Sequence, residues 1–182
     1  DARFVKCLQL AATKLSLVDL SGIAFKENVL VELIDGLRTN PALKTLYLNN
    51  IKTKPKSDNL LGTLLNYPSL QRLYISGSFG SDAIFGFLEA LKGGSKALTV
   101  LDVSNNSLTD IGAFALANII RIDNLLVELK VDGNGISLPG FQALYECLKV
   151  NHAVRKIHFP TADYVAAAAS LQGVKLERLH NV

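Results

Sequence analysis

The sequence contains neither Trp nor Met, and it has only two Cys and 7% aromatic residues among its 182 residues. Cys7 and Cys147 are too far apart and too few to form the disulfide framework of a small secreted domain. Both lie in helix-like apolar stretches, so we expect buried free thiols in a cytoplasmic protein. No apolar run approaches the roughly 18 residues that span a bilayer, and no secretion-signal pattern follows Asp1. We therefore expect no direct membrane insertion.

An excess of charge of one sign is also missing. The 19 Lys and Arg and the 16 Asp and Glu leave a formal net charge of +3, which gives no concentrated basic field for nucleic-acid binding. The three His have no metal-ligand spacing, and neither Cys has a CxxC partner. The sequence also has no G-x-S-x-G, Walker A or strand-linked G-x-G-x-x-G motif. We expect no enzyme activity, no metal, no cofactor and no small-molecule substrate. Gly93 and Gly94 are interpreted as a helix C-terminal cap and not as a phosphate loop.

What the sequence does contain is an internal repeat. The clearest copy fits the pattern L-x-x-L-x-L-x-x-N-x-L with Leu98, Leu101, Val103, Asn106 and Leu108. The copies are separated by steps of 28, 27, 28, 28 and 28 residues. Their starts are Leu15, Leu43, Leu70, Leu98, Leu126 and Val154.

A second column, 18 residues after each of the first five starts, is always Leu. Around it, apolar residues recur three to four positions apart, which is the spacing of an amphipathic helix. Ser81 with Asp82, Thr109 with Asp110, and Ser137 precede these stretches and are predicted N-caps. Each unit is therefore predicted to run strand, turn, helix, loop. The column consists of Leu33, Leu61, Leu88, Leu116 and Leu144.

One such unit cannot bury its apolar faces alone, so neighbours must stack into a solenoid with a continuous core. The units resemble leucine-rich repeats of the ribonuclease-inhibitor class. We therefore predict one α/β leucine-rich-repeat domain over residues 1–182, with parallel strands on the concave face and helices on the convex face. Residues 1–14 are expected to end a preceding repeat, with a strand as the alternative. The first unit looks cut open, so we also expect further repeats upstream.

The ninth position of each repeat usually carries an Asn that bonds to backbone in the turn. Only two copies keep it, so we expect an irregular ladder at both ends and distorted turns around the basic loop at residues 52–56. That loop is interpreted as solvated, with an acidic or phosphate partner as the alternative. The column reads Ile23, Ile51, Ser78, Asn106, Asn134 and Ala162.

The outward side chains of the strands form columns that we predict to bind a partner protein. Tyr47 and Tyr74 should be neighbours on adjacent strands with Arg72 beside them, and Tyr and Arg often anchor protein interfaces. The alternative is that these are ordinary exposed residues that stabilise each other across strands. The predicted binding residues are Asp19, Thr45, Tyr47, Arg72, Tyr74, Asp102, Glu128, Lys130, Asp132, Lys156 and His158.

The last third of the chain resembles the closing repeats of the CARMIL proteins, which link capping protein, Arp2/3 and myosin I. That resemblance implies a scaffold of the actin cytoskeleton at the cell cortex. It does not extend clearly over residues 175–182, and in that family the segments that bind capping protein and membrane lie outside the repeats. It is carried by Gly140 and Phe141, Asn151 and His152, Val154 and Arg155, Phe159 and Pro160, and Asp163.

Residues 160–182 are predicted to terminate the solenoid. Pro160 lacks a backbone donor and would end the strand ladder, and the Leu column fails at Gln172. The alanines at 166–169 indicate a helix, while residues 176–179 fit a last strand or a helical turn. A tropomodulin-like cap, a GTPase-activating repeat protein of the RanGAP kind and an innate-immune sensor or inhibitor are alternative functions.

Overall fold

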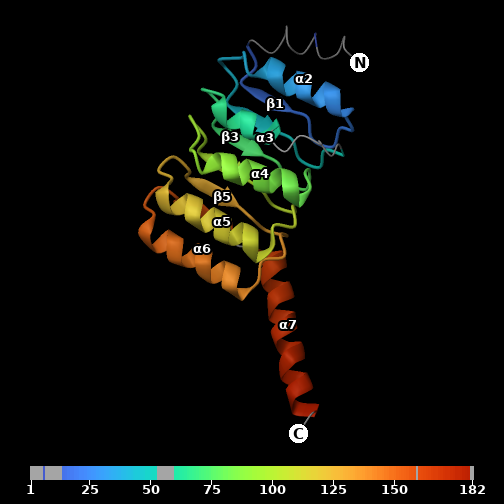
Figure 1. The fold of residues 1–182 in the computed structure, drawn as a ribbon, viewed down its shortest axis with the longest axis vertical. Helices are drawn as coiled ribbons and strands as arrows, with labels where there is room; N and C mark the ends of the chain where they lie inside the picture. Colours follow the sequence, from blue (N-terminus) through green and yellow to red (C-terminus); the bar gives the residue numbers. More distant parts are fainter. Residues whose placement is uncertain (1–5, 7–13, 53–59, 159, 181–182) are drawn as a thin grey trace.

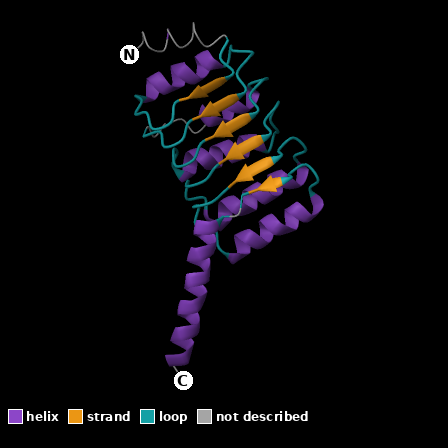
Figure 2. Ribbon diagram, turned by 180° about the vertical axis from the view of Figure 1, so that it is seen from behind, coloured by secondary structure: helices purple, strands orange, loops and turns teal. Residues whose placement is uncertain are grey.

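The computed structural model describes residues 6, 14–52, 60–158 and 160–180, with side chains described as far as residue 170. Six short parallel strands form one sheet in the order β1-β2-β3-β4-β5-β6. The helices of the repeats cover one face of this sheet (Figures 1 and 2). The strands are β1 (Leu17–Asp19), β2 (Thr45–Tyr47), β3 (Arg72–Tyr74), β4 (Val100–Asp102), β5 (Glu128–Lys130) and β6 (Lys156–Ile157). The helices are α2 (Glu27–Leu37), α3 (Leu60–Thr63), α4 (Ser81–Leu91), α5 (Thr109–Ile122), α6 (Leu138–Val150) and α7 (Thr161–His180), with a 3-10 turn η1 (Leu64–Asn66) after α3.

Each strand begins two residues after a repeat start. In the strand register, Val18 lies opposite Leu46, and Leu46 lies opposite Leu73. These central side chains point into the core while their neighbours point outward, because side chains alternate along a strand. The repeat pattern therefore predicted both the strands and their register. From Val18 to Leu129 the central residues are at most 5% exposed.

The helix layer completes the core. The predicted Leu column lies on the inner side of the helices, and all five of its members are buried. Full burial of a Leu side chain contributes roughly 1.5–3 kcal/mol, so both columns add substantially to the stability of the array. In the described part of the second repeat, the helix layer consists of α3 and η1. There the Tyr67 hydroxyl donates to the Ile34 carbonyl in the core.

Two smaller predictions also have a clear outcome. Gly93 and Gly94 follow α4, and their N–H groups donate to Ala90 and Leu91, as expected of a C-terminal cap. Cys147 is a buried free thiol, and burial raises its pKa. Cys7, the conformation of residues 1–14 and most of the basic loop lie outside the described residues.

The N-cap prediction was wrong in detail. Ser81 and Thr109 are the first helical residues, and the caps are Gly80 and Leu108, which offer no side-chain acceptor. Ser137 does precede α6, but its hydroxyl makes no cap hydrogen bond. For α6, a side chain of the preceding repeat supplies the acceptor instead.

Asp110, in the first turn of α5, serves the start of α6. Its Oδ1 accepts the N–H of Ser137 at 2.8 Å and of Gly140 at 3.2 Å, and its Oδ2 accepts the Ser137 hydroxyl at 2.5 Å. A carboxylate on the free N–H groups of a helix N-terminus is a favourable placement. The Gly at position 140 permits it, because a Cβ there would meet Asp110 Oδ1.

The ladder of turn side chains extends beyond its two Asn residues. Asn106 accepts the N–H of Phe79, and Asn134 accepts the N–H of Asn106. Ser78 extends the ladder upstream by accepting the N–H of Ile51 at 3.1 Å. Downstream, Asp163 accepts the N–H groups of Asn134 and Gly135 at 2.9 and 2.7 Å. A serine and an aspartate therefore perform at the ends the task that Asn performs in the middle.

Helix α7 starts at this last rung and then leaves the array (Figure 1). Asp163 is only 3% exposed, whereas Tyr164 and Val165 are 54% and 60% exposed. The sequence of residues 176–179 fits either a strand or a helical turn, and in the structure these residues belong to α7. None of the helices in the described part of the chain is long and apolar enough to cross a membrane.

Candidate partner-binding face

The outward side chains of β1 to β6, with those just beyond the strand ends, form a surface that we call the strand face. Its middle column follows the register from Asp19 to Tyr47, Tyr74, Asp102 and Lys130. His158 continues this column just after β6, where its N–H donates to the Leu129 carbonyl at 3.1 Å. The structure thus places the predicted residues on one surface in the predicted order.

Tyr47 and Tyr74 form the centre of the strand face. Their rings stack with centroids 4.4 Å apart and planes inclined by 11°, as the prediction of neighbouring tyrosines required. Both rings are partly exposed. Burial, followed by the charges of Tyr47 and Glu128, raises the pKa of Tyr74. An aromatic pair of this kind offers a large and rigid apolar contact area at the protein surface.

Lys130 lies over the ring of Tyr74, at one side of the tyrosine pair. Its ammonium group lies 5.3 Å from the centroid of the Tyr74 ring, within the range of a cation–π contact. The same group lies 4.0 Å from Asp102 Oδ2. An ion pair as long as 4.0 Å between partly exposed side chains contributes little, about 0–1 kcal/mol at the protein surface, so it positions Lys130 more than it stabilises the fold.

Glu128 organises the end of the strand face nearest α7. Its Oε1 lies 2.6 Å from His158 Nε2 and 3.1 Å from Lys156 Nζ. The hydrogen bond with His158, with further help from Lys156, holds the pKa of Glu128 below its usual value. Three residues predicted separately for partner binding therefore form one cluster.

Two predicted residues lie differently from the expectation. Thr45 is only 6% exposed, because it lies between Leu17 of β1 and Arg72 of β3. It therefore adds little accessible surface to the strand face. Asp132 Oδ1 accepts the N–H groups of Gly133, Ala162 and Asp163 at 2.9, 2.9 and 3.3 Å. This carboxylate joins β5 to the start of α7, a structural task that the sequence analysis missed.

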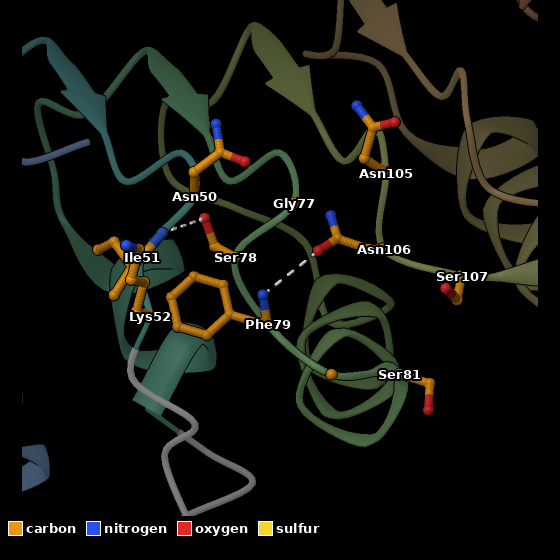
Figure 3. Close-up of a pocket in the computed structure, with 11 residues that line it drawn as sticks. Asn50, Ile51, Lys52, Gly77, Ser78, Phe79, Ser81, Asn105, Asn106 and Ser107 are labelled. Atoms are coloured by element: carbon orange, nitrogen blue, oxygen red, sulfur yellow. Dashed lines mark hydrogen bonds between the residues drawn. The ribbon is translucent and has the colours of Figure 1, made fainter. Parts of the chain in front are cut away.

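A second feature that the sequence analysis missed is a hollow at the turns that follow the strands. It has a volume of about 560 Å³ and is lined by side chains of three successive repeats, with buried Phe79 among them and Asn50, Lys52 and Asn105 at its exposed parts (Figure 3). The N–H of Ile51 and the N–H of Phe79 are bonded to Ser78 and Asn106 within it (Figure 3).

The turns beside this hollow have a regular backbone. The eighth position of the first five repeats has a positive φ, and Gly and Asn alternate there. Each Asn amide lies over the next Gly: a Cβ on Gly77 would meet the Asn50 side chain, and one on Gly133 would meet Asn105. This alternation is visible in the sequence and could have located the turns. The column reads Gly22, Asn50, Gly77, Asn105 and Gly133.

The described residues contain no cluster of three or more His, Cys, Asp or Glu side chains that could hold a metal ion. The features that remain are an aromatic pair, exposed charges and a continuous sheet surface. Such a surface suits contact with another macromolecule.

The fold and this surface define a leucine-rich-repeat solenoid. Residues 94–117 match the family model described as "Leucine Rich repeat", the stretch that contains the clearest copy of the motif. The solved C-terminal domain of tropomodulin from Caenorhabditis elegans is similar with a TM-score of 0.63 and 14% identity, and the match covers 98% of each chain. At that identity the likeness supports the fold alone.

The sequence comparisons are more specific. The chain is 32% identical over 167 residues, or 88% of its length, to "Capping protein, Arp2/3 and myosin-I linker protein 3" of Homo sapiens, a CARMIL protein. It is 26% identical over 82% of its length to "Rho GTPase-activating protein gacW" of Dictyostelium discoideum. The match spans only 12% and 14% of these relatives. This chain is a CARMIL-like leucine-rich-repeat region, as the resemblance of its last third indicated.

Proposed function

We propose that this chain is a protein-interaction region of an actin-cytoskeleton protein and that the strand face is its contact surface. The observation that carries the proposal is the stacked, partly exposed pair of Tyr47 and Tyr74 at the centre of that face. A rigid aromatic pair beside Arg72 has the composition of an interface anchor. The similarity to a capping protein, Arp2/3 and myosin-I linker supports the actin connection.

We also propose that the repeats form one domain, whose last unit is closed by the start of α7 at Asp163, at the C-terminal end of a longer CARMIL-like array. The protein acts as a scaffold in the cytoplasm, at the cell cortex, and carries out no catalysis itself. The remaining predicted residues of the strand face surround the tyrosine pair and set the orientation of the partner.

Binding to purified partners tests the proposal. Actin filaments, capping protein, the Arp2/3 complex and myosin-I are each presented to the immobilised chain, and the bound fraction is measured. We expect saturable binding of at least one of them, with loss in the double variant Tyr47→Ala and Tyr74→Ala. The control variant Glu89→Ala with Lys92→Ala removes an exposed ion pair at the C-terminal end of α4, in the helix layer, and should bind normally.

The same assay separates the alternative suggested by the Rho GTPase-activating relative. A Rho-type GTPase is added as a further ligand, and GTP hydrolysis is measured with and without the chain. Stimulation of hydrolysis, without binding to the actin-associated proteins, would replace the scaffold proposal with a regulatory one.

A further inference from the structure

The charged side chains of the strand face differ in whether the chain itself supplies a partner. Each of its four carboxylates accepts at least one hydrogen bond or ion pair from within the chain. Asp19 and Asp102 accept the backbone N–H groups of Ser21 and Ser104, respectively. Glu128 is engaged by Lys156 and His158, and Asp132 by three backbone N–H groups. Each carboxylate of this face therefore already has a hydrogen-bond or ion-pair partner within the chain.

Three cationic side chains of the same face lack such a partner in the described part of the chain. Lys44, Arg72 and Arg155 are exposed, and within the described part of the chain their side chains have no hydrogen bond or ion pair. All three lie where the strands begin: Lys44 precedes β2, Arg72 opens β3, and Arg155 precedes β6. The charged side chains of this face that lack a partner among the described residues are therefore cations, and these three lie at the starts of their strands.

Lys44 and Arg72 are also close neighbours. The backbone N–H of Arg72 donates to the carbonyl of Lys44 at 2.9 Å, so Lys44 lies next to the residue directly opposite Arg72, which is Thr45. On its own row, Arg72 lies between Thr45 and Val100, neither of which is charged. The tyrosine pair begins two residues further along the same two strands. A compact positive spot thus borders the aromatic pair.

We propose that this part of the strand face binds an acidic segment of a partner protein. The carboxylates of the bound segment pair with Lys44 and Arg72, and the apolar groups of the segment contact the rings of Tyr47 and Tyr74. Arg suits this role because its guanidinium group can hold a carboxylate through two parallel hydrogen bonds. The position of this binding site rests on the proposed function. The new claim is that the bound segment of the partner is acidic.

The position of Arg155 indicates how the bound acidic segment runs relative to the strands. It lies at the start of β6, three strands beyond Arg72, which is about 14 Å at the usual spacing of 4.7–4.9 Å between strands. An extended chain advances roughly 3.3 Å per residue, so a carboxylate about four residues further along the segment reaches Arg155. The segment therefore runs across the strands and not parallel to them.

A set of matched peptides tests the inference without an identified partner. Three fluorescein-labelled peptides alternate Leu with Glu, with Gln or with Lys, and their binding to the full chain is followed by fluorescence anisotropy at low ionic strength. The Glu peptide should bind about tenfold more tightly than the Gln peptide, and added salt should reduce the difference because the charges are exposed. Equal binding of the Glu and Gln peptides, or tighter binding of the Lys peptide, would overturn the inference.

Variants locate the contact. Arg72→Gln with Lys44→Gln should abolish the preference for the Glu peptide, and Arg155→Gln should reduce it less. Lys92→Gln with Lys149→Gln removes the same two positive charges from exposed positions in the helix layer and should leave the preference intact. A preference that this control lowers as much as the paired substitution does would show a general charge effect and would refute the site.

Failure of this inference differs from failure of the proposed function. If an actin-associated partner binds, loses affinity in Tyr47→Ala with Tyr74→Ala, and is indifferent to Arg72→Glu with Lys44→Glu, the proposed function stands and the acidic segment is wrong. If no such partner binds the unaltered chain, the proposed function fails, while the peptide preference still decides the inference.

Discussion

The rings of Tyr47 and Tyr74 stack face to face with centroids 4.4 Å apart, although the residues are 27 positions apart in the sequence. The parallel register of β2 and β3 places them side by side. Because they project from a sheet whose inner residues are fully buried, they can be removed without opening the core. Function and stability can therefore be separated at this site.

The first prediction concerns that separation. Tyr47→Ala with Tyr74→Ala should lower the free energy of unfolding only modestly, and the coupling between the two sites should be about 0.5–1.5 kcal/mol. A double-mutant cycle measured by urea denaturation gives this coupling. Leu73→Ala, which truncates the buried residue between Arg72 and Tyr74, should cost about 2–5 kcal/mol. A tyrosine variant as unstable as Leu73→Ala would contradict the separation.

The second prediction concerns the turn ladder. The Asn106 amide donates to the carbonyls of Ile75, Val103 and Ser104 at 2.9–3.0 Å in a buried position. Asn106→Ala leaves these acceptors unsatisfied, and each such loss costs about 1–3 kcal/mol, so the variant should be strongly destabilised.

Denaturant unfolding checks this against a matched control. Asn118→Ala, on the exposed side of α5, removes the same side chain from a position where it is solvated, and it should change stability by less than about 0.5 kcal/mol. Similar losses in both variants would show that the ladder contributes little.

The third prediction concerns the rung formed by Asp163. Asp163→Ala removes the acceptor for the N–H groups of Asn134 and Gly135, so these two amides should exchange with solvent faster, and the end of the array should open first. Amide hydrogen exchange measured by NMR reports both sites. Exchange at Leu46 and Leu73, four and three repeats upstream of Asp163, should be unchanged. Uniform acceleration along the chain would indicate global destabilisation instead.

The fourth prediction uses two glycines with the same backbone angle. Gly133 and Gly135 both have φ +71, but only at Gly133 would an added Cβ collide with a side chain, that of Asn105. Ala at either site incurs the cost of a left-handed conformation, about 1–2 kcal/mol. Gly133→Ala should be more destabilising than Gly135→Ala in thermal or chemical unfolding. Equal effects would show that Asn105 moves aside freely.

The fifth prediction concerns pH. The hydrogen bond with His158 holds the pKa of Glu128 below its ordinary value of 4.5. A carboxyl group with a lowered pKa in the folded state stabilises the protein above pH 4.5, and this contribution is lost as the pH falls through the folded-state pKa. The stability difference between the unaltered chain and Glu128→Gln should therefore shrink in acid. Denaturation curves over a pH series measure it, and a difference that does not change with pH would contradict the assignment.

The strands, their order and the tyrosine pair could be predicted from the sequence because each depends on one repeated spacing. A period of 27–28 residues sets the register, and the register decides that Tyr47 meets Tyr74. The inward Leu columns follow from the same spacing, since an apolar residue that recurs once in every unit must face the shared core.

What could not be predicted are the contacts between successive repeats. Asp110 caps a helix that begins one full repeat away, and Asp132 bonds to backbone about 30 residues further along the chain. Neither carboxylate has a local pattern that distinguishes it from an exposed acid. Thr45 is buried by its neighbours in the row, which alternation along a single strand cannot show. These residues depend on how closely the units stack.

The central claim is that the strand face binds a protein partner through Tyr47 and Tyr74. It is tested most directly by the affinity of an actin-associated partner for the unaltered chain and for Tyr47→Ala with Tyr74→Ala, alongside Glu89→Ala with Lys92→Ala. The account predicts at least a tenfold loss of affinity, about 1.4 kcal/mol, for the tyrosine variant only. Equal affinity of all three proteins, with the fold of each intact, would contradict it.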